Sequence, residues 1–364
     1  MNLKKLENTF KKNSIKILSF FICVKKYKTI DISNAKNILI IRQHDQLGDM
    51  LCSTPLFRAL KKKFPDSYIA LVSGVVNTNV VLDNPFLDEV IEYNNIKILQ
   101  KYSLLFGFIK KLREKKYDFV VVPVTVSMSV TSDLIAFLSR SRYRIGVASL
   151  NGVNNQTSFL YNYTVSLDWR NANKHQTERN IDILEDFSID TNNYSLVVGL
   201  NEEELKYAGD FYNKFHKKGK ISVGIHPGAG KLKNQWPSNK FGEIIDILLQ
   251  KYNCEIFITE GPMDRESIKY FYNNYFDKVT FICEKNIKMV AAIINKLSIF
   301  ITNDTGIMHL ASATSVPVIS LFGPTDPLQW APKRSNDQYL VGENGDICNI
   351  SVNDVCLAIK NIIF

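Results

Sequence analysis

The stretch SIFITNDTGIMHLASATSVPVISLF (298–322) decides the fold class. It begins with an apolar run that predicts a buried strand over 298–302, followed by a polar turn and a helix over 306–314. A second apolar run predicts another buried strand over 316–322. Strands that are apolar on both faces are typical of parallel sheets, in which a helix leads from each strand to the next. The stretch therefore predicts a β–α–β unit.

The same alternation runs through most of the chain. In the first half, apolar runs predict strands over 37–42, 68–72, 118–123 and 143–147, with helices over 48–63, 104–116 and 130–140. In the second half they predict strands over 221–225 and 255–259, with helices over 239–251 and 287–297. A chain of 364 residues suits two such domains. We expect an α/β protein with two doubly wound, Rossmann-like domains, 36–200 and 201–364, facing a central cleft, after an N-terminal arm, 1–35.

The basic charge of the chain is concentrated in that arm. The net charge is +9, and residues 1–30 hold eight lysines against Glu7, so this segment carries +7 and the rest +2. A nucleic-acid-binding domain carries its basic charge over a folded face, so we expect no nucleic-acid partner. The six cysteines form no CxxC pair and do not cluster with histidine. We therefore expect no metal site, no disulfide framework and a reducing, cytoplasmic location.

The arm has an amphipathic pattern. At 100° per residue, one face collects Leu3, Leu6, Phe10, Ile17, Phe21 and Val24. The lysines point elsewhere, which predicts a helix lying on an anionic membrane surface. A frayed terminal helix, or one docked on the core, is the alternative. The apolar part, 17–24, is too short to span a bilayer, and no cleavage site of a signal peptide follows it.

The loop after the first strand, 43–49, carries Gly48 and Asp49 at the start of a helix. An acid in a first helical turn is stabilised by the helix dipole, which is reason enough for Asp49 to stand there. The functional alternative is a general base. Such an aspartate keeps a low pKa and is a weak base, so it works only when bond formation has made the attacking hydroxyl acidic.

Two loops in the second half can hold a phosphate. His226-Pro227-Gly228-Ala229-Gly230 follows the strand 221–225, and its small residues let backbone N–H groups approach an anion, with Lys231 and Lys233 as counter-charges. A plain glycine-rich turn is the alternative.

Asn303-Asp304-Thr305-Gly306 opens the helix 306–314. Its free N–H groups, the Thr305 hydroxyl and the ring of His309 one turn later form a candidate anion site. Asp304 is either a helix cap, which needs no ligand, or a group that faces ribose, sugar hydroxyls or a backbone amide.

Five stretches together resemble glycosyltransferase family 9, the ADP-heptose:lipopolysaccharide heptosyltransferases. They are ILIIRQHDQLGDMLCSTPLFRAL (38–60), HQTERNIDILEDF (175–187), VGIHPGAG…WPSNKF (223–241), ITEGPMDRE (258–266) and ITNDTGIMHLASATSVPVISLFGPTDP (301–327). They occur in the family's order and cover most of the chain from residue 36 onward. The D-T-G-x-x-H element and the early G-D pair carry the resemblance.

The resemblance implies a GT-B fold, with acceptor bound by the first domain and ADP-sugar by the second. It implies inverting transfer without metal or other cofactor, with Asp49 as the general base. It further implies that donor binding falls to Gly228, Ala229, Gly230, Asp304, Thr305, Gly306 and His309. The acceptor would be a lipid-linked surface glycan such as the lipopolysaccharide core, at the inner face of the bacterial inner membrane, where the arm would hold the enzyme peripherally.

One position departs from the family pattern. The family usually has a lysine two residues before the tryptophan of the W-P pair, where it neutralises the leaving diphosphate, and this chain has Asn234 there. Lys233 or Lys231 is then the candidate substitute. The acid usually found after the next strand corresponds to Asp264 or Glu260. The missing lysine leaves two alternatives open: a transferase that uses another nucleotide-sugar, and a non-catalytic nucleotide-sugar-binding partner in glycan assembly.

Overall fold

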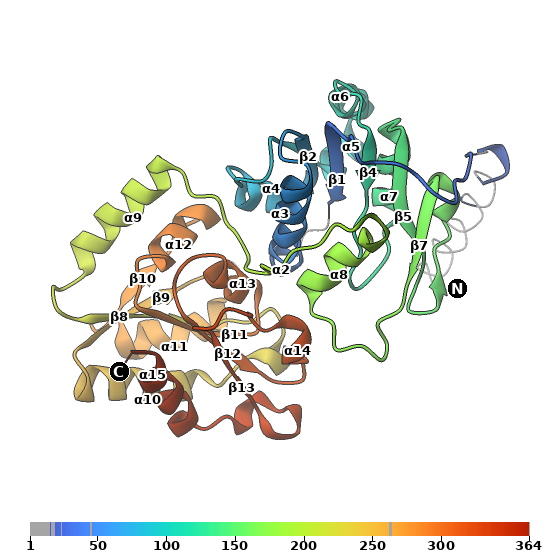
Figure 1. Ribbon diagram of the computed structural model, residues 1–364. Coiled ribbons are helices and arrows are strands. Elements are labelled where there is room, and N and C mark those ends of the chain that lie inside the picture. The colour runs from blue at the N-terminus through green and yellow to red at the C-terminus, as the bar shows by residue number, and fades with distance from the viewer. Residues whose placement is uncertain (1–14, 16–18, 23, 44–45, 262–263, 364) are drawn as a thin grey trace. The chain divides into compact units, whose positions relative to one another are not determined.

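The computed structural model describes residues 15, 19–22, 24–43, 46–261 and 264–363. Contacts divide the chain into two compact units. Unit 1 comprises Met1–Asp45, Leu56–Thr78 and Pro85–Asn192, and unit 2 comprises Gln46–Pro55, Asn79–Asn84 and Asn193–Phe364. Each unit is a parallel sheet with helices packed against it, as the sequence predicts (Figure 1). Most of the basic arm lies outside the described residues, so the amphipathic helix predicted there stays a prediction.

The sheet of unit 1 has the strand order β3-β2-β1-β4-β5-β6, with β7 also paired to β5. Its strands are β1 (Asn37–Arg42), β2 (Tyr68–Gly74), β3 (Glu89–Tyr93), β4 (Phe119–Val121), β5 (Tyr143–Leu150), β6 (Val153–Asn154) and β7 (Tyr163–Leu167). All pairs are parallel except β5 with the two-residue β6. The associated helices are α3 (Thr54–Lys63), α4 (Val75–Val81), α5 (Asn95–Gln100), α6 (Tyr102–Leu112), α7 (Val130–Leu138) and α8 (Gln176–Asp182).

The sheet of unit 2 is fully parallel, in the order β10-β9-β8-β11-β12-β13. Its strands are β8 (Ile221–His226), β9 (Cys254–Thr259), β10 (Thr280–Ile282), β11 (Ile299–Asn303), β12 (Val318–Phe322) and β13 (Gln338–Val341). The helices are α2 (Leu47–Leu51), α9 (Glu202–Phe215), α10 (Ser238–Lys251), α11 (Arg265–Tyr275), α12 (Ile287–Ile294), α13 (Gly306–Ser312), α14 (Pro327–Trp330) and α15 (Val352–Ile363). The strand order reverses between β8 and β11, and the crevice beyond their carboxyl ends is where such sheets bind ligands.

Helix packing in unit 2 follows the apolar periodicity of the sequence. In α10, Phe241, Ile244, Ile245 and Leu248 recur at helical spacing and are all buried. They join a core that includes Trp236 and the inward side chains of β8, β9, β11 and β12. This core holds the carboxyl ends of β8 and β11 in fixed positions, from which the loops of the candidate site start.

The single helix predicted over 48–63 is wrong, because the chain breaks between α2 and α3. Pro55 has no N–H and cannot continue the hydrogen-bond ladder to the carbonyl of Leu51. The Thr54 hydroxyl donates to that carbonyl instead, at 2.8 Å. The Ser53 hydroxyl likewise donates to the carbonyl of Met50, at 2.5 Å. The break separates α2 from α3 and leaves α2, with Asp49, in unit 2.

Among the described residues, no helix is long and apolar enough to cross a membrane.

Candidate functional site

Two neighbouring strands of unit 2 end in polar side chains, His226 on β8 and Asn303 on β11. Asn303 is fully buried, and its amide nitrogen donates to the carbonyls of Pro227 and Gly228, at 2.9 and 3.0 Å. Its amide oxygen accepts from the backbone N–H of Trp236, at 3.0 Å. One buried amide thus ties the glycine-rich loop to the segment that follows it. Within the stretch 303–309, the sequence alone assigns Asn303 no separate role, although a polar residue ending an apolar strand is a usable indication.

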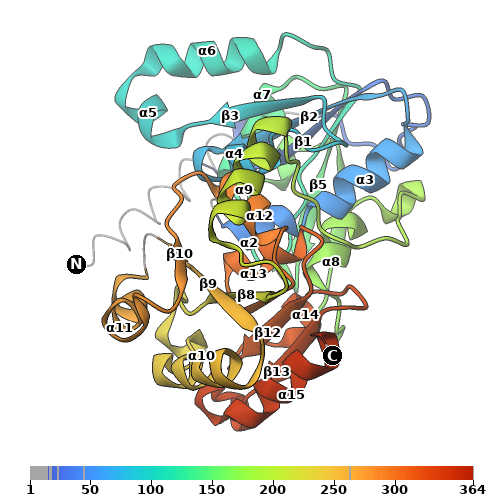
Figure 2. The same ribbon diagram turned by 90° about the vertical axis from the view of Figure 1, so that its left-hand side faces the viewer.

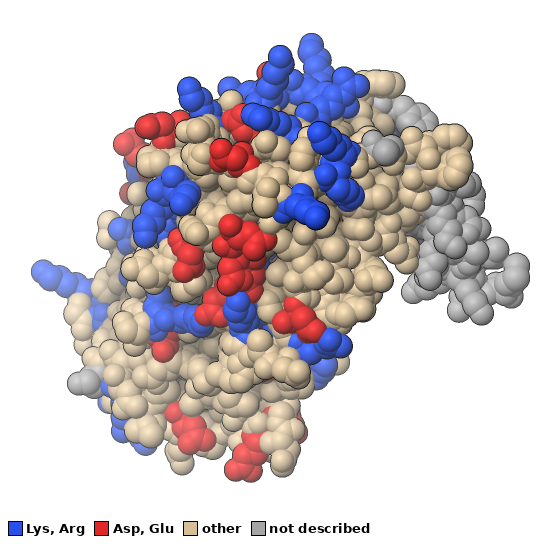
Figure 3. Space-filling model, turned by 45° about the vertical axis from the view of Figure 1, so that its right-hand side comes forward, with Lys and Arg blue, Asp and Glu red and all other residues tan. Residues whose placement is uncertain are grey.

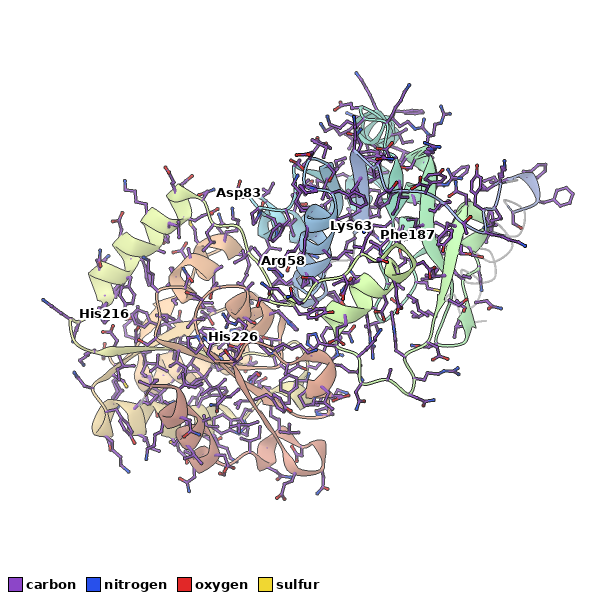
Figure 4. The ribbon with its side chains drawn as sticks, viewed as in Figure 1. Arg58, Lys63, Asp83, Phe187, His216 and His226 are labelled. Atoms are coloured by element: carbon purple, nitrogen blue, oxygen red, sulfur yellow. The ribbon has the colours of Figure 1, made fainter. Side chains whose placement is uncertain are left out.

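The glycine-rich loop packs against Asp264. A Cβ atom on Gly228 would stand 2.0 Å from Oδ1 of Asp264, so a larger residue there would displace the Asp264 carboxylate or the loop. The other carboxylate oxygen accepts from the backbone N–H of Gly261 at 2.6 Å and lies 3.9 Å from Nε2 of His226. Figure 4 labels His226 within unit 2. Burial lowers the pKa of His226, whereas the charge of Asp264 acts to raise it.

The structure distinguishes the two acids that the sequence left open. Asp264 lies at the glycine-rich loop, next to Gly228. Glu260 turns to another surface, where its carboxylate accepts from the Tyr272 hydroxyl at 3.0 Å and from the Cys283 thiol at 3.5 Å. Along the loop itself, Gly228 is buried, Ala229 half-buried and Gly230 exposed.

Asp304 does not act through the cap of α13. Its carboxylate accepts from the amide nitrogen of Asn234 at 3.0 Å, and the same nitrogen lies 3.2 Å from the Thr325 hydroxyl. Burial raises the pKa of Asp304, and the hydrogen bond from Thr325 and the positive charge of Lys231 act in the opposite direction. Asn234, Asp304 and Thr325 therefore form a polar triangle across the loops that follow β8, β11 and β12.

Two atoms beside this triangle are candidates for ligand contacts. Among the described residues, the side-chain oxygens Oδ1 of Asn234 and Oγ1 of Thr305 are buried without a hydrogen-bond partner. A buried polar atom without a partner costs about 1–3 kcal/mol. The Thr305 hydroxyl can donate to an anionic oxygen, and the Asn234 oxygen can accept from a sugar hydroxyl.

The two candidate lysines differ in their surroundings. Lys233 belongs to the short 3-10 helix Leu232–Asn234, and its side chain is exposed. Lys231 is also exposed, but its charge acts on the carboxylate of Asp304. Lys231 is thus the cation that the structure brings to the Asp304 triangle.

Helix α2 packs closely on α13 through two glycines. A Cβ on Gly48 would lie 2.6 Å from Cδ2 of His309, and a Cβ on Gly306 would lie 3.1 Å from Cβ of Leu47. Asp49, next to Gly48, is buried, with 9% of its surface exposed. Both helices belong to unit 2, so Asp49 shares one compact unit with the D-T-G-x-x-H motif.

The His309 ring lies between α2 and α14. Its Nδ1 atom is 3.6 Å from the sulfur of Cys52, and its ring centre is 5.9 Å from that of Trp330. The sequence predicts that this ring faces an oxyanion. In the structure it is 3% exposed and packs against the helix that carries Asp49. The position of α2 therefore depends on His309.

The model of the family described as glycosyltransferase family 9 (heptosyltransferase) matches residues 105–356, more than half of the chain. The chain belongs to this family. Family 9 membership, predicted from five stretches of sequence, is confirmed, and so is the assignment of the chain as a glycosyltransferase.

Curated and solved relatives extend the match to most of the chain. Lipopolysaccharide heptosyltransferase 3 of Escherichia coli is 27% identical over 310 residues, which span 79% of this chain and 84% of the relative. The crystal structure of the family 9 glycosyl transferase from Veillonella parvula superposes with a TM-score of 0.79 at 22% identity, covering 93% and 99% of the two chains. E. coli ADP-heptose lps heptosyltransferase II gives a TM-score of 0.74 at 20% identity, covering 90% and 98%. The family 9 chain has the GT-B fold that the sequence predicts.

Proposed function

We propose that this family 9 enzyme transfers a heptose from ADP-heptose to a hydroxyl of a lipid-linked surface glycan such as the lipopolysaccharide core. The observation that carries the proposal is the packing of α2 on α13, which holds Asp49 and the D-T-G-x-x-H motif in one unit. A protein that only binds a nucleotide needs the donor motif but has no use for a general base held in the same unit. The names of the relatives, among them an ADP-heptose lps heptosyltransferase, support the choice of donor and acceptor.

The donor contacts in this proposal come from the loops of unit 2. The backbone N–H groups of Gly228, Ala229 and Gly230 cradle the diphosphate, and the Thr305 hydroxyl donates to one of its oxygens. Lys231 supplies the counter-charge that Asn234 does not, with Lys233 as the alternative. Asn234 accepts from a sugar hydroxyl through its unpartnered oxygen, and Asp304 holds the asparagine in place.

In the proposed reaction, Asp49 takes the proton of the acceptor hydroxyl as its oxygen attacks the anomeric carbon. The bond from that carbon to the diphosphate oxygen breaks, and the electron pair leaves with ADP. Attack opposite to the leaving group inverts the anomeric centre. The cradle and Lys231 stabilise the charge that develops on the leaving diphosphate, the contribution that a metal ion provides in other transferases.

Three further points belong to the proposal. The acceptor is bound by the domain 36–200 and the donor by 201–364. Transfer proceeds without a metal or other cofactor. The enzyme acts in the cytoplasm, peripherally at the inner membrane face, where its lipid-linked acceptor lies.

A nucleotide panel followed by a transfer assay tests the donor assignment. ADP is expected to raise the unfolding temperature more than UDP, GDP or CDP at equal concentration, since binding to the folded state alone stabilises it. ADP-heptose with a heptose-deficient lipopolysaccharide should then give product at the same rate with and without EDTA. Stronger stabilisation by another diphosphate would overturn the donor assignment, and full inhibition by EDTA would overturn metal independence.

One observation favours a second candidate. Asn234 stands where the family usually has a lysine, so the enzyme has less charge for a leaving diphosphate. A non-catalytic nucleotide-sugar-binding partner would bind ADP-heptose in calorimetry but release no ADP with any acceptor. Release of ADP that depends on both acceptor and Asp49 would exclude this alternative.

A further inference from the structure

A helical hairpin lies at one edge of the unit 1 sheet, next to its edge strand β3. It consists of α5, α6 and the four residues that follow, 95–116, and we call it the edge hairpin. Figure 2 shows α6 in side view at the margin of its unit, with α5 beside it. The edge hairpin is remote in sequence from every stretch that the proposed reaction uses.

The edge hairpin is strongly basic. It contains Lys97, Lys101, Lys110, Lys111, Arg113, Lys115 and Lys116 against the single acid Glu114, a net charge of seven minus one, +6. Figure 3 shows lysine and arginine side chains crowded along the upper edge of the molecule, where α6 lies in Figure 1. Lys111 forms ion pairs with Glu89 and Glu114. Among the described residues, the other lysines of the edge hairpin form no ion pair.

The edge hairpin also exposes large apolar side chains. Phe106 is 72% exposed, Ile96 65% and Leu104 42%. The inner face of α6 is packed normally, with Leu112 buried and the ring of Phe108 stacked edge-on against Tyr93, at 5.1 Å between ring centres. Phe106 is two residues from Phe108 on α6 and points away from this inner face, so it is additional to the residues that hold α6 on its sheet.

An apolar and a basic side chain share the exposed face of α6. Phe106 and Lys110 are four residues apart on α6, so they share one face of the helix. A cavity of about 300 Å³ lies on the other side of α6, toward α5 and β3, and its lining includes the apolar groups of Ile98, Leu104 and Phe108, the lysines Lys97 and Lys111, and Glu92. An exposed aromatic ring one helical turn from a lysine, within a strongly basic hairpin, is what an anionic membrane interface accommodates.

We infer that the edge hairpin docks the folded enzyme on an anionic lipid bilayer. Lys97, Lys101 and Lys110 lie at the lipid phosphates, and Phe106 and Ile96 enter the boundary between headgroups and acyl chains. A nucleic acid would match the charge but would leave Ile96 and Leu104 without an apolar environment, so the surface fits a bilayer better. The inference does not depend on the donor or the reaction proposed above.

Vesicle co-sedimentation with the full chain tests this surface. A variant with Lys97→Gln, Lys101→Gln and Lys110→Gln is compared with one that carries Lys214→Gln, Lys217→Gln and Lys218→Gln, three exposed lysines of unit 2 with the same change in charge. On phosphatidylglycerol-rich vesicles, the edge-hairpin variant should bind about 100-fold more weakly than the wild type, because each of the three lysines near an anionic surface contributes about a fivefold factor. The control variant should stay within about threefold of the wild type. Equal behaviour of the two variants would overturn the inference, even if the N-terminal arm binds the vesicles.

The apolar contribution is tested in the same way. Phe106→Ser should weaken partition several-fold, whereas Leu357→Ser, which removes a 59% exposed leucine from α15, should not. Unfolding temperatures near that of the wild type show that these exposed substitutions leave the fold intact.

A direct reporter completes the test. Tryptophan emission of Phe106→Trp should shift to the blue on anionic vesicles and be quenched by lipids with brominated acyl chains beyond the quenching of the three native tryptophans. Absence of that extra quenching would contradict insertion. Binding of a single-stranded RNA that is tighter than vesicle binding, and that depends on the same three lysines, would show that the surface serves nucleic acid instead.

Discussion

Gly48 lies so close to His309 that a Cβ atom on the glycine would stand 2.6 Å from Cδ2 of the ring. Real Cβ atoms essentially never approach another atom so closely, so the contact requires glycine. It joins the early G-D pair to the D-T-G-x-x-H motif, although about 260 positions separate Gly48 from His309 in the sequence. The two halves of the family's sequence signature are thus one packing unit.

Gly48→Ala should destabilise the protein by about 1–3 kcal/mol, because the added methyl group overpacks the interface between α2 and α13. This is expected even though alanine is favoured over glycine within a helix by about 1 kcal/mol. Urea unfolding measures the change. In a His309→Ala background the same substitution should cost much less, since the clashing ring is gone. Equal costs in both backgrounds would show that the contact is not what requires glycine.

Gly228→Ala should weaken ADP binding at least tenfold. The new Cβ would stand 2.0 Å from Oδ1 of Asp264, so the glycine-rich loop or the Asp264 carboxylate that supports it has to move. Gly209→Ala, in α9, is the matched control, because a Cβ there meets nothing within 4 Å. Calorimetry with ADP compares the two variants. Unchanged ADP affinity in Gly228→Ala would remove the loop from the donor site.

Asn234→Lys should tighten ADP binding about tenfold, since a charge-assisted contact to the diphosphate contributes about 1.5–3 kcal/mol and the lost bond to Asp304 offsets part of it. Lys231→Met should weaken ADP binding by a similar factor. Lys233→Met, on an exposed side chain of the same segment, should change it less. Titration calorimetry ranks the three variants. A larger loss in Lys233→Met than in Lys231→Met would assign the counter-charge to Lys233.

Asp304→Asn should stabilise the protein without ligand at neutral pH. Burial raises the pKa of Asp304, so the folded chain holds this proton more tightly than the unfolded chain does. The contribution of Asp304 to stability is therefore present below the ordinary aspartate pKa and is lost as the pH rises through the raised one. The stability gap between variant and wild type should be largest near pH 8 and should shrink toward pH 4. Denaturant unfolding at both pH values measures it, and a gap that widens on acidification would contradict the burial argument.

The sequence predicts best the strands that are buried on both faces. β1, β8 and β11 are continuous apolar runs and were predicted within one or two residues. The edge strands β3 and β13 were not predicted, because they are short and partly exposed, and their polar residues interrupt the pattern. The helix over 48–63 was predicted through Pro55, whose missing N–H ends the ladder.

Some features of the candidate site could likewise be predicted from the sequence and others could not. Asp49 and Asp304 could be singled out because each follows an apolar strand, which places it at the ligand-binding edge of a parallel sheet. The contact of Gly48 with His309 could not be predicted, since it joins segments far apart in the sequence. The choice of Asp264 over Glu260, and the triangle of Asn234, Asp304 and Thr325, likewise depend on how loops from different strands meet.

In the proposed reaction, Asp49 is the base of a sugar transfer at the donor motif. Its role can be measured by single-turnover transfer from ADP-heptose to a heptose-deficient lipopolysaccharide, with wild type and Asp49→Asn side by side. Loss of a general base lowers rates by about 10²–10⁴, so Asp49→Asn should be slower by at least 100-fold while its ADP affinity stays within about threefold of the wild type. Transfer by Asp49→Asn at the wild-type rate would show that Asp49 is not the base.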